Sequence, residues 1–325
     1  MKSVLAALAL ASALAPAAFA DKPLLSAQTP IEVPGGPGHF DFIYVDQDLH
    51  RLLACHPGGK NLVVLDLKTK VVTTVDTGAV NGAGIDIPDN KYFTAGGNQD
   101  IVVVDRATLA KVADIPTTGP CDDVVYDSKS GMVYVCNDDG TQDWIINPKT
   151  NKIVGTVTIA GAPEVVKYDP RTDRLYQNIK PTNQVQVIDP VTNTVVATWS
   201  TAPATSPHGL ALDSGRGRIF SAGKNGKLIA IDVKSGKTIG SCDIAQGVDE
   251  IAYDPSSQQI YCGCAGYISI VKSTKRGLKP VGDVPITAKS KNAAFDPETQ
   301  SVWIAYDDGK GSYLQEFRQS SVASR

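Results

Sequence analysis

The segment Val165–Tyr176 reads VVKYDPRTDRLY and shows the pattern that decides the fold. A short run of strand-forming residues leads to Asp169, a polar turn follows, and a second apolar pair lies six and seven residues after the aspartate. The same pattern recurs along the chain at intervals of 40 to 44 residues. Its anchor aspartates are Asp46, Asp86, Asp127, Asp169, Asp213, Asp254 and Asp296. Seven copies in one register indicate a repeat protein.

Each copy contains enough short apolar runs for four β-strands. Beyond the pair that follows Asp169, the run 185–189 ends at a polar turn, and the run 195–198 comes after that turn. Short runs rich in Val, Ile, Thr and Tyr, separated by Asp, Pro, Gly and Asn, are typical of strands and turns. No ten-residue stretch after Asp21 has a helical period. The sequence therefore predicts an all-β, seven-bladed β-propeller with four-stranded blades.

The two ends of the repeat region are expected to complete one another. The last copy has three strands, near 293–295, 302–306 and 312–317, and lacks a fourth. The segment 24–33 matches the outer strand of the other copies but belongs to no copy of its own. We expect it to pair beside 312–317, which closes the ring and protects two open sheet edges. The propeller is thus predicted to span residues 21–325.

The repeated aspartates are predicted to have a structural role. An aspartate carboxylate at the start of a turn can accept hydrogen bonds from the backbone N–H groups that follow it. We therefore do not expect the anchor aspartates to be catalytic.

Net charge excludes one class of partner. The 325 residues include 31 Lys and Arg against 34 Asp and Glu, a formal net charge of −3. This balance provides no basic surface for nucleic acid, so DNA binding is disfavoured. A closed ring has no free strand edge, so a monomer is expected.

Residues 1–20 have the pattern of a cleaved signal peptide. A lysine precedes an apolar run at 4–14, and Ala18-Phe19-Ala20 forms a small-residue cleavage site. Spanning a bilayer takes about 20 apolar residues, and Pro16 interrupts this run. We expect a periplasmic or secreted protein with no membrane span after cleavage.

The six cysteines of an exported chain can form disulfides. None lies in a Cys-x-x-Cys or Cys-x-x-Cys-His motif, which excludes a zinc ribbon, a thioredoxin motif and a c-type haem site. Cys121 and Cys136 flank one predicted hairpin, and a bridge that closes about 15 residues would stabilise the protein by roughly 3 kcal/mol. The sequence leaves open whether this pair is bridged or free.

Three phrases of the repeat resemble a known family. They are VQVIDPVTNTVV at 185–196, VKYDP at 166–170 and MVYV at 132–135. These phrases look like the exported YncE-like, YVTN-repeat seven-bladed propellers, and the resemblance covers the whole mature chain. It implies a periplasmic or secreted propeller from a family with no single activity. Relatives of similar architecture include lactonases and cofactor-handling proteins, so the resemblance specifies the fold more than the function.

One set of polar positions is expected at the mouth of the central channel. The innermost strand of each blade lines this channel, and counting back five residues from each anchor aspartate gives the residue nearest its entrance. All seven are polar: Asp41, Asn81, Asp122, Glu164, His208, Asp249 and Lys291. His39 lies two residues before Asp41. We expect these eight residues to form a ligand-binding ring.

Two interpretations of this ring stay open. Its residues either solvate a wet entrance or bind a cation or small polar ligand, because close carboxylates repel one another without compensation. The candidate metal ligands are Asp41, Asp122, Glu164 and Asp249. A divalent cation such as Ca²⁺ suits their oxygens, whereas adding His208 or His39 favours Zn²⁺ or another transition metal. Lys291 argues against a purely metal cage and suits an acidic neighbour or an anionic ligand group.

The predicted function is binding of a small ligand, metal ion or protein partner at the mouth. The alternative is a metal-assisted hydrolase, such as a lactonase, or a lyase, in which a cation polarises a carbonyl and His208 or Glu164 moves a proton. His208 is the first candidate base because the usual pKa of histidine lies near neutrality. His50 and His56 fall in turns and are expected to be solvated. No nucleophile elbow, phosphate loop, His-Glu-x-x-His or dinucleotide motif occurs, so whether the protein is an enzyme stays open.

Overall fold

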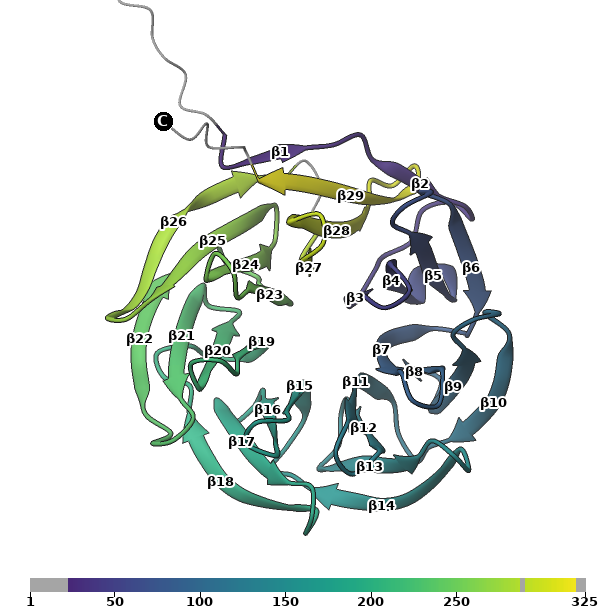
Figure 1. Cartoon of the computed structure of the whole chain (residues 1–325), viewed down its shortest axis with the longest axis horizontal. Coiled ribbons are helices and arrows are strands. Elements are labelled where there is room, and N and C mark those ends of the chain that lie inside the picture. Colours follow the sequence, from purple (N-terminus) through teal and green to yellow (C-terminus); the bar gives the residue numbers. More distant parts are fainter. Residues whose placement is uncertain (1–22, 287–289, 320–325) are drawn as a thin grey trace, which may run out of the picture.

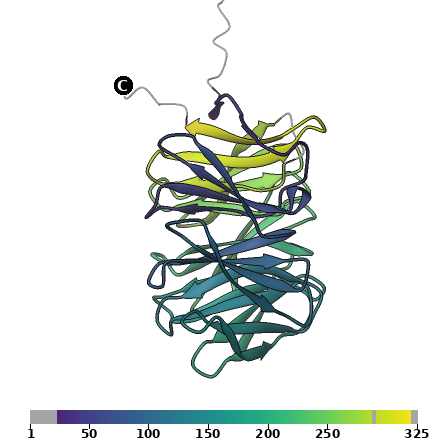
Figure 2. The same cartoon turned by 90° about the vertical axis from the view of Figure 1, so that its right-hand side faces the viewer.

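The computed structural model describes residues 23–286 and 290–319. Seven antiparallel sheets stand around a central axis (Figure 1), and the ring is a disc when it is viewed on its edge (Figure 2). The described residues form strands and one short 3₁₀ turn, Pro57–Gly59. The predicted all-β, seven-bladed propeller is therefore confirmed. The predicted signal peptide, residues 1–20, lies outside the described part of the chain.

The first four blades follow one another along the chain, each running from its inner strand to its outer strand. Blade 1 comprises β3 (Ile43–Asp46), β4 (Arg51–His56), β5 (Asn61–Asp66) and β6 (Val72–Asp76). Blade 2 comprises β7 (Val80–Asp86), β8 (Lys91–Gly96), β9 (Asp100–Asp105) and β10 (Lys111–Pro116). Blade 3 comprises β11 (Cys121–Asp127), β12 (Met132–Asn137), β13 (Gln142–Asn147) and β14 (Lys152–Thr158). Blade 4 comprises β15 (Pro163–Asp169), β16 (Arg174–Ile179), β17 (Gln184–Asp189) and β18 (Thr194–Ser200).

The remaining blades keep the same order. Blade 5 comprises β19 (Pro207–Asp213), β20 (Arg218–Gly223), β21 (Lys227–Asp232) and β22 (Thr238–Asp243). Blade 6 comprises β23 (Ile251–Asp254), β24 (Gln259–Cys264), β25 (Tyr267–Thr274) and β26 (Gly277–Pro285). Blade 7 takes three strands from the end of the chain: β27 (Ala294–Asp296), β28 (Ser301–Asp307) and β29 (Ser312–Gln319).

The N-terminal segment supplies the outer edge of blade 7. Two short strands, β1 (Leu25–Ala27) and β2 (Ile31–Val33), both pair antiparallel with β29. Leu25 lies opposite Gln319, and Ile31 lies opposite Leu314. The expected pairing of 24–33 with the last strand is confirmed, and Figure 1 shows the N-terminal strands lying along β29.

The anchor aspartates hold the turn between the first and second strands of each blade. In blade 1, the backbone N–H of Leu49 donates to Asp46 Oδ1 at 3.3 Å. In the other blades, a backbone N–H two or three residues after the aspartate donates to its Oδ1, at Asp86, Asp127, Asp169, Asp213, Asp254 and Asp296. The structural role expected for these carboxylates is thus present in all seven blades.

The hydrophobic core is divided into seven clusters, which lie between neighbouring blades. Consecutive residues of a middle strand face opposite neighbours: Leu52 packs toward blade 7 and Leu53 toward blade 2. Both faces of such a strand are buried, which explains why it reads as a continuous apolar run instead of an alternating one. Propeller packing therefore comes from blade-to-blade contact on both sides of every sheet.

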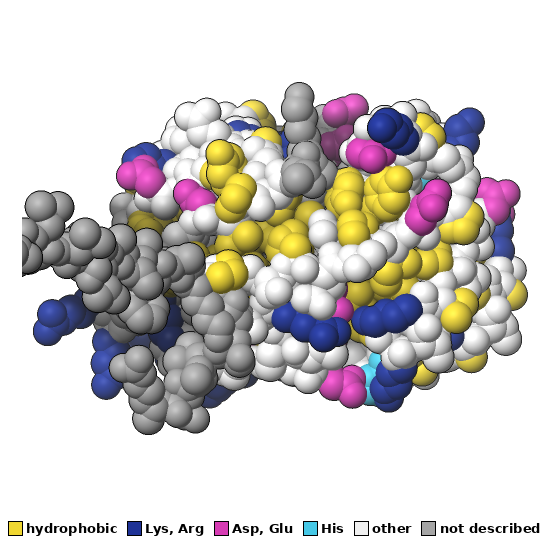
Figure 3. Space-filling view, turned by 90° about the horizontal axis from the view of Figure 1, so that it is seen from above, with side chains coloured by type: hydrophobic (Ala, Val, Ile, Leu, Met, Phe, Trp, Pro, Cys, Tyr) yellow, Lys and Arg dark blue, Asp and Glu magenta, His cyan; other side chains and the backbone are white. Residues whose placement is uncertain are grey.

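The outer strands face solvent with one side. Figure 3 shows this outer surface beside blade 7, where apolar side chains lie among charged ones. Leu24 and Val281 are each 40 % exposed there. No helix in 23–286 or 290–319 has the length and apolar character needed to cross a lipid bilayer.

The possible bridge between Cys121 and Cys136 is not formed. All six cysteines are free thiols, and these two lie on opposite faces of the same sheet. Cys121 packs toward blade 2, with its sulfur 3.3 Å from Thr117 Oγ1, and Cys136 packs toward blade 4, where Gln177 Nε2 donates to its sulfur. The two positions flank one hairpin in sequence, but the pleat directs their side chains apart.

Asp143 is a buried carboxyl between blades 3 and 4 that should make stability depend on pH. Gln177 Nε2 donates to its Oδ1 at 3.1 Å, and burial raises its pKa to about 7. The folded state therefore holds a proton more tightly than the unfolded state, so stability present below about pH 4 is lost as the pH rises to 7.

The Asp143→Asn variant should lack this loss, because its amide does not ionise. Between pH 4 and 7.5, wild type should lose on the order of 4 kcal/mol of unfolding free energy relative to the variant. Urea unfolding at both pH values measures the difference. Parallel pH profiles for the two proteins would show that Asp143 does not titrate in this range.

Candidate functional site

The mouth of the ring is formed where the chain enters the inner strands. In blades 2 to 5, the strand register shifts by a β-bulge at this point. The residues in these bulges are Asn81, Asp122, Glu164 and His208, four of the eight predicted ring residues. A bulge redirects a side chain out of the regular pleat and is common beside functional sites.

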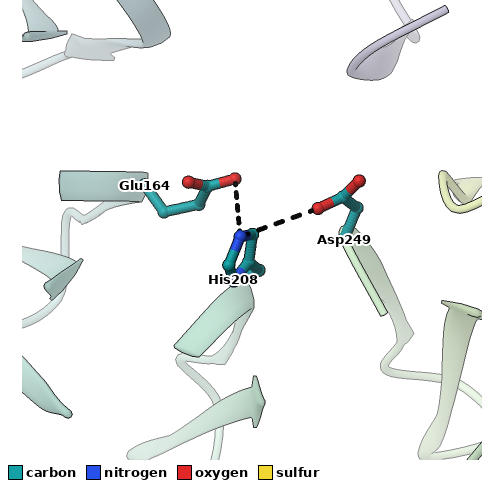
Figure 4. A group of neighbouring side chains, drawn as sticks. All are labelled: Glu164, His208 and Asp249. Atoms are coloured by element: carbon teal, nitrogen blue, oxygen red, sulfur yellow. Dashed lines mark ion pairs between the residues drawn. The ribbon is translucent and has the colours of Figure 1, made fainter. Parts of the chain in front are cut away.

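Three of the predicted ring residues, from blades 4, 5 and 6, converge on one point (Figure 4). His208 Nε2 lies 3.8 Å from Glu164 Oε1 and 4.0 Å from Asp249 Oδ1. The three side chains place one ligand atom each within 4.8 Å of one another. We call this group the triad.

A hydrogen bond to the backbone of Ser206 decides which ring nitrogen of His208 carries the proton. Its Nδ1 lies 2.8 Å from the carbonyl oxygen of Ser206, which can only accept a hydrogen bond. The ring proton of neutral His208 therefore lies on Nδ1, and the lone pair of Nε2 faces the two carboxylates of the triad. A lone pair that faces acceptors needs a cation or a proton between them. Metal-bound histidines have this same arrangement, in which the other ring nitrogen donates to a carbonyl.

Two lysines pair with the triad carboxylates. Lys180 Nζ lies 2.6 Å from Glu164 Oε2 and 3.1 Å from Asp138 Oδ1. Lys224 Nζ forms an ion pair with Asp249 Oδ1. Lys180 leaves Glu164 Oε1 facing His208, whereas Lys224 pairs with Asp249 Oδ1, the same oxygen that lies 4.0 Å from His208 Nε2.

Sequence reasoning missed these two lysines and Asp138. Each follows the second strand of its blade, eleven residues after the anchor aspartate of blades 3, 4 and 5. Counting forward eleven residues from each anchor aspartate would therefore have found these three residues in the sequence. This signal was weak because the equivalent residues of blades 1, 2 and 6 are Pro57, Gly97 and Ala265.

Burial decides the charge states of the triad. It raises the pKa of Glu164 to about 7, against the opposing effect of Lys180. Burial, together with the positive charge of Lys224, lowers the pKa of His208 to about 4. His208 is thus neutral near pH 7, as a metal ligand must be. A base with so low a pKa is weak at neutral pH, which favours Glu164 over His208 for proton transfer.

Asp122 and Asp41 are the other two mouth carboxylates that the structure brings close to the triad. Burial, reinforced by the charges of Asp249 and Glu164, raises the pKa of Asp41 well above its usual value. Burial and the charge of Glu164 do the same for Asp122. Asp122, Asp138 and Glu164 form a second group with ligand atoms within 4.8 Å. Lys180 pairs with two of its members, so this second group already contains a cation.

The remaining predicted ring residues do not join the triad. Asn81 Nδ2 donates to the carbonyl oxygen of Cys121 at 3.1 Å and links blades 2 and 3. Lys291 and His39 are exposed at the rim. Among the described residues, the Lys291 ammonium has no ion-pair partner, so of its two suggested partners the acidic neighbour is not found and the anionic ligand group stays untested.

Neighbouring carboxylates join the blades to one another. Asp123 Oδ2 accepts the backbone N–H of Val166 at 3.0 Å. Glu250 accepts the N–H of Ile43 at 3.1 and 3.2 Å. The carboxylates of Asp123 and Glu250 thus accept hydrogen bonds from backbone N–H groups of neighbouring blades, which gives them a structural role.

A cavity of about 290 Å³ adjoins the triad between blades 6, 7 and 1. Asp249 belongs to both the triad and the cavity wall. The wall also includes His39, Phe40, Asp41, Lys291 and Tyr306. The mouth therefore offers both a cluster of ligand atoms and an adjoining space for a small molecule.

The other two histidines lie away from this point. His56 was expected to be solvated, but it is 1 % exposed. Its ring stacks on Phe40 at 4.2 Å, and its Nε2 lies 3.1 Å from the carbonyl oxygen of Gly38. His50 is partly exposed in the turn after β3, where it contacts Glu298.

Comparison with known proteins supports the fold. No family model and no curated protein matches this chain. A chain of Kuenenia stuttgartiensis hydrazine synthase is 15% identical with a TM-score of 0.75, over 90% of this chain and 98% of that chain. A chain in the crystal structure of a mitotic checkpoint complex is 13% identical with a TM-score of 0.80, over 99% of this chain and 100% of that chain.

The chain is a seven-bladed β-propeller. At such low identities, the likeness extends to the fold alone. Propellers of this kind commonly bind ligands or proteins, so the assignment of a specific activity depends on the mouth of this particular chain.

Proposed function

We propose that this protein is an exported binding propeller, similar to the YncE-like family, whose mouth binds a divalent metal cation through Glu164, His208 and Asp249. The observation that carries the proposal is the Nε2 lone pair of His208, which faces two carboxylate oxygens. Within the described residues, no hydrogen-bond donor contacts this nitrogen. A cation placed between the three atoms accepts the His208 lone pair and Glu164 Oε1 and shares Asp249 Oδ1 with Lys224.

The chemistry of the ligands favours Zn²⁺ or a similar transition metal over Ca²⁺. Zn²⁺ accepts both imidazole nitrogens and carboxylate oxygens as ligands, and open zinc sites use three protein ligands. Calcium takes six to eight oxygens and disfavours a nitrogen ligand. The separations of 3.8 and 4.0 Å require only a small closure around a zinc ion with bonds of about 2.0–2.2 Å. The carboxylates are held in turn by Lys180 and Lys224, as outer partners hold metal ligands elsewhere.

Export places this site outside the cytoplasm. The proposal of a periplasmic or secreted protein is supported by the signal-peptide pattern of residues 1–20. N-terminal sequencing of the exported protein tests it, since a mature chain that does not begin at Asp21 contradicts the predicted cleavage.

Purified mature protein should bind one Zn²⁺ per chain. After treatment with EDTA, titration calorimetry should show one site for Zn²⁺ and much weaker binding of Ca²⁺, and Zn²⁺ should raise the unfolding temperature. Elemental analysis of protein purified without chelator provides the native metal content. An unchanged unfolding temperature with no heat of Zn²⁺ binding would overturn the proposal.

A metal-assisted hydrolase or lyase is the second candidate function. The observation that favours it is that Asp249 belongs both to the triad and to the wall of the 290 Å³ cavity, so a substrate in the cavity would lie beside the metal ligands. A bound metal would polarise a substrate carbonyl, such as that of a lactone. The same metal-loaded protein is therefore assayed on a panel of lactones and esters. Turnover that Glu164→Gln abolishes supports an enzyme, and no turnover leaves a binding protein.

A further inference from the structure

The outer strand of every blade has one edge that its own sheet leaves open. The ring closure on which the expected monomer rested completes blade 7, but it does not cover these outer edges. The unpaired N–H and C=O groups of such an edge can pair with another chain, and proteins protect their edges with β-bulges or with very short strands. Propellers normally present only short, protected edges, so an unprotected one is a candidate interaction surface.

Six of the seven outer edges in the described blades are protected. In blades 2 to 6, the pairing of the outer strand with the third strand shifts by one residue, as it does at a β-bulge. The residues left unpaired are all β-branched and between 37 and 57 % exposed: Val112, Val154, Val196, Ile239 and Val281. A bulge bends its strand and interrupts the ladder, so a straight partner strand does not fit it. The edge of blade 7 is divided between β1 and β2, which have three residues each.

The outer strand of blade 1, β6, has neither protection. Its five residues pair with β5 in an unbroken register. The backbone N–H of Asp66 donates to the carbonyl oxygen of Val71, and backbone groups alternate in direction along an antiparallel strand. Every second residue, Val72, Thr74 and Asp76, therefore directs its N–H and C=O groups away from β5. Within the described chain no strand lies outside β6, which forms part of the rim in Figure 1 and lies on the side that faces the viewer in Figure 2.

A second copy of β6 matches this edge. Two copies related by a two-fold axis pair their identical strands antiparallel, and centring the pair on Thr74 brings all five residues into register. Thr74 then lies opposite Thr74 of the second copy, and Thr73 lies opposite Val75. Cross-strand pairs of β-branched residues stabilise a sheet. The sequence of β6 is therefore suited to pairing with itself.

The charges at the two ends of β6 are complementary. Lys70 lies in the turn before β6, and its side chain is 37 % exposed, with a long ion pair of 3.7 Å to Glu316. Asp76 ends β6, is exposed and forms no ion pair among the described residues. In the pairing centred on Thr74, Lys70 of each copy lies diagonally across from Asp76 of the other, within the reach of a lysine side chain. The second copy therefore supplies Asp76 with a cationic partner.

We propose that two copies of this protein associate through β6, so that their first blades form one continuous sheet of eight strands. The inference goes beyond the proposed function, because β6 contributes no residue to the triad or to the wall of the adjoining cavity. A contact of five residues per copy is small beside the roughly 800 Å² per partner of a standard stable interface. The dimer is therefore expected to form only at high protein concentration.

Sedimentation velocity of the mature protein tests the association directly. The proportion of dimer should rise as the concentration is raised from about 10 µM to about 1 mM, the range of a weak interface. Hydrogen exchange at the same concentrations locates the contact, because the amides of Val72, Thr74 and Asp76 should exchange several-fold more slowly in the dimer. A single monomeric species at about 1 mM would overturn the proposal, and so would a dimer in which these three amides exchange as in the monomer.

Two matched variants separate β6 from the other edges. Thr74→Lys places like charges directly opposite one another in the dimer and should weaken association roughly fivefold or more. Thr198→Lys is the control, because Thr198 is exposed at the equivalent position of the bulged strand β18 in blade 4 and should leave association unchanged. Wild-type association in Thr74→Lys, or an equal loss in the two variants, would show that β6 is not the contact.

Insertion of one valine after Val72 gives blade 1 the extra residue that blades 2 to 6 have. The longer strand should form a bulge and keep the protein monomeric at about 1 mM. Its unfolding temperature, compared with that of wild type, shows whether the blade is intact. A folded insertion variant that associates as wild type does would contradict the proposal.

Discussion

His208→Ala should lower the affinity of the protein for Zn²⁺ by about 100-fold or more. His208 supplies the single nitrogen of the triad, and its loss leaves two carboxylates that already pair with lysines. Replacing residues that merely orient metal ligands reduces affinity roughly 10- to 100-fold, so loss of a ligand should equal or exceed the upper end. Competition of EDTA-treated protein against a zinc-binding dye measures the change.

The matched control for this prediction is His50→Ala. His50 lies in the turn at the opposite end of the inner strand β3 and contacts Glu298. This variant should bind Zn²⁺ as wild type does. Wild-type affinity in His208→Ala would place the metal ligands elsewhere, provided that its unfolding temperature in EDTA matches that of wild type.

Replacing Arg106 with methionine should reduce the free energy of unfolding by about 3–5 kcal/mol. The guanidinium is 2 % exposed and contacts both oxygens of Asp46, which is 1 % exposed, at distances of 2.9 to 3.1 Å. Arg106 follows the last residue of β9 in blade 2, and Asp46 ends β3 in blade 1, so the pair joins two blades. Methionine leaves the Asp46 carboxylate buried, with the hydroxyl of Tyr92 as its neighbour. An uncompensated buried charge is the physical source of the loss.

Urea unfolding distinguishes this mechanism from a simple loss of volume. The double variant Asp46→Asn, Arg106→Met should regain part of the stability, because it removes the stranded charge as well as its partner. Arg171→Met is the control, since Arg171 is exposed and its removal should cost less than about 1 kcal/mol. Equal destabilisation in the single and double variants would indicate that packing, not charge, explains the effect.

The repeat itself made the fold predictable from sequence. An aspartate at one position in every copy fixes a turn by local hydrogen bonds, and such local rules can be read without the structure. The closing strand was predictable because the last copy lacks a fourth strand, whereas the segment 24–33 resembles such a strand and belongs to no copy. Asp46 shows the limit of this reasoning: its turn bond was expected, but its pairing with Arg106 was not. That pairing crosses two blades, and nothing in the local pattern of either residue indicates it.

The site was predictable to the level of position and no further. The fixed offset brought Glu164, His208 and Asp249 to one face, because every inner strand begins there. The offset could not show that β-bulges turn Asn81 toward a backbone carbonyl and His208 toward two acids. Lys291 was expected to contribute charge at the mouth, but the ammonium groups that pair with the carboxylates come from Lys180 and Lys224. The offset predicts where a residue lies along its strand but not where its side chain points, and this explains the differences.

The pairing of β1 and β2 with β29 also sets the order in which the molecule can be assembled. Ile31 meets Leu314, so β2 is synthesised long before the strand with which it pairs. Until then, both ends of the row of blades have open edges that can pair with other chains. Completion of the disc therefore has to wait until β29 has been synthesised. The adjacency of the two end segments also makes this fold suited to circular permutation, with new termini placed in a loop between two blades.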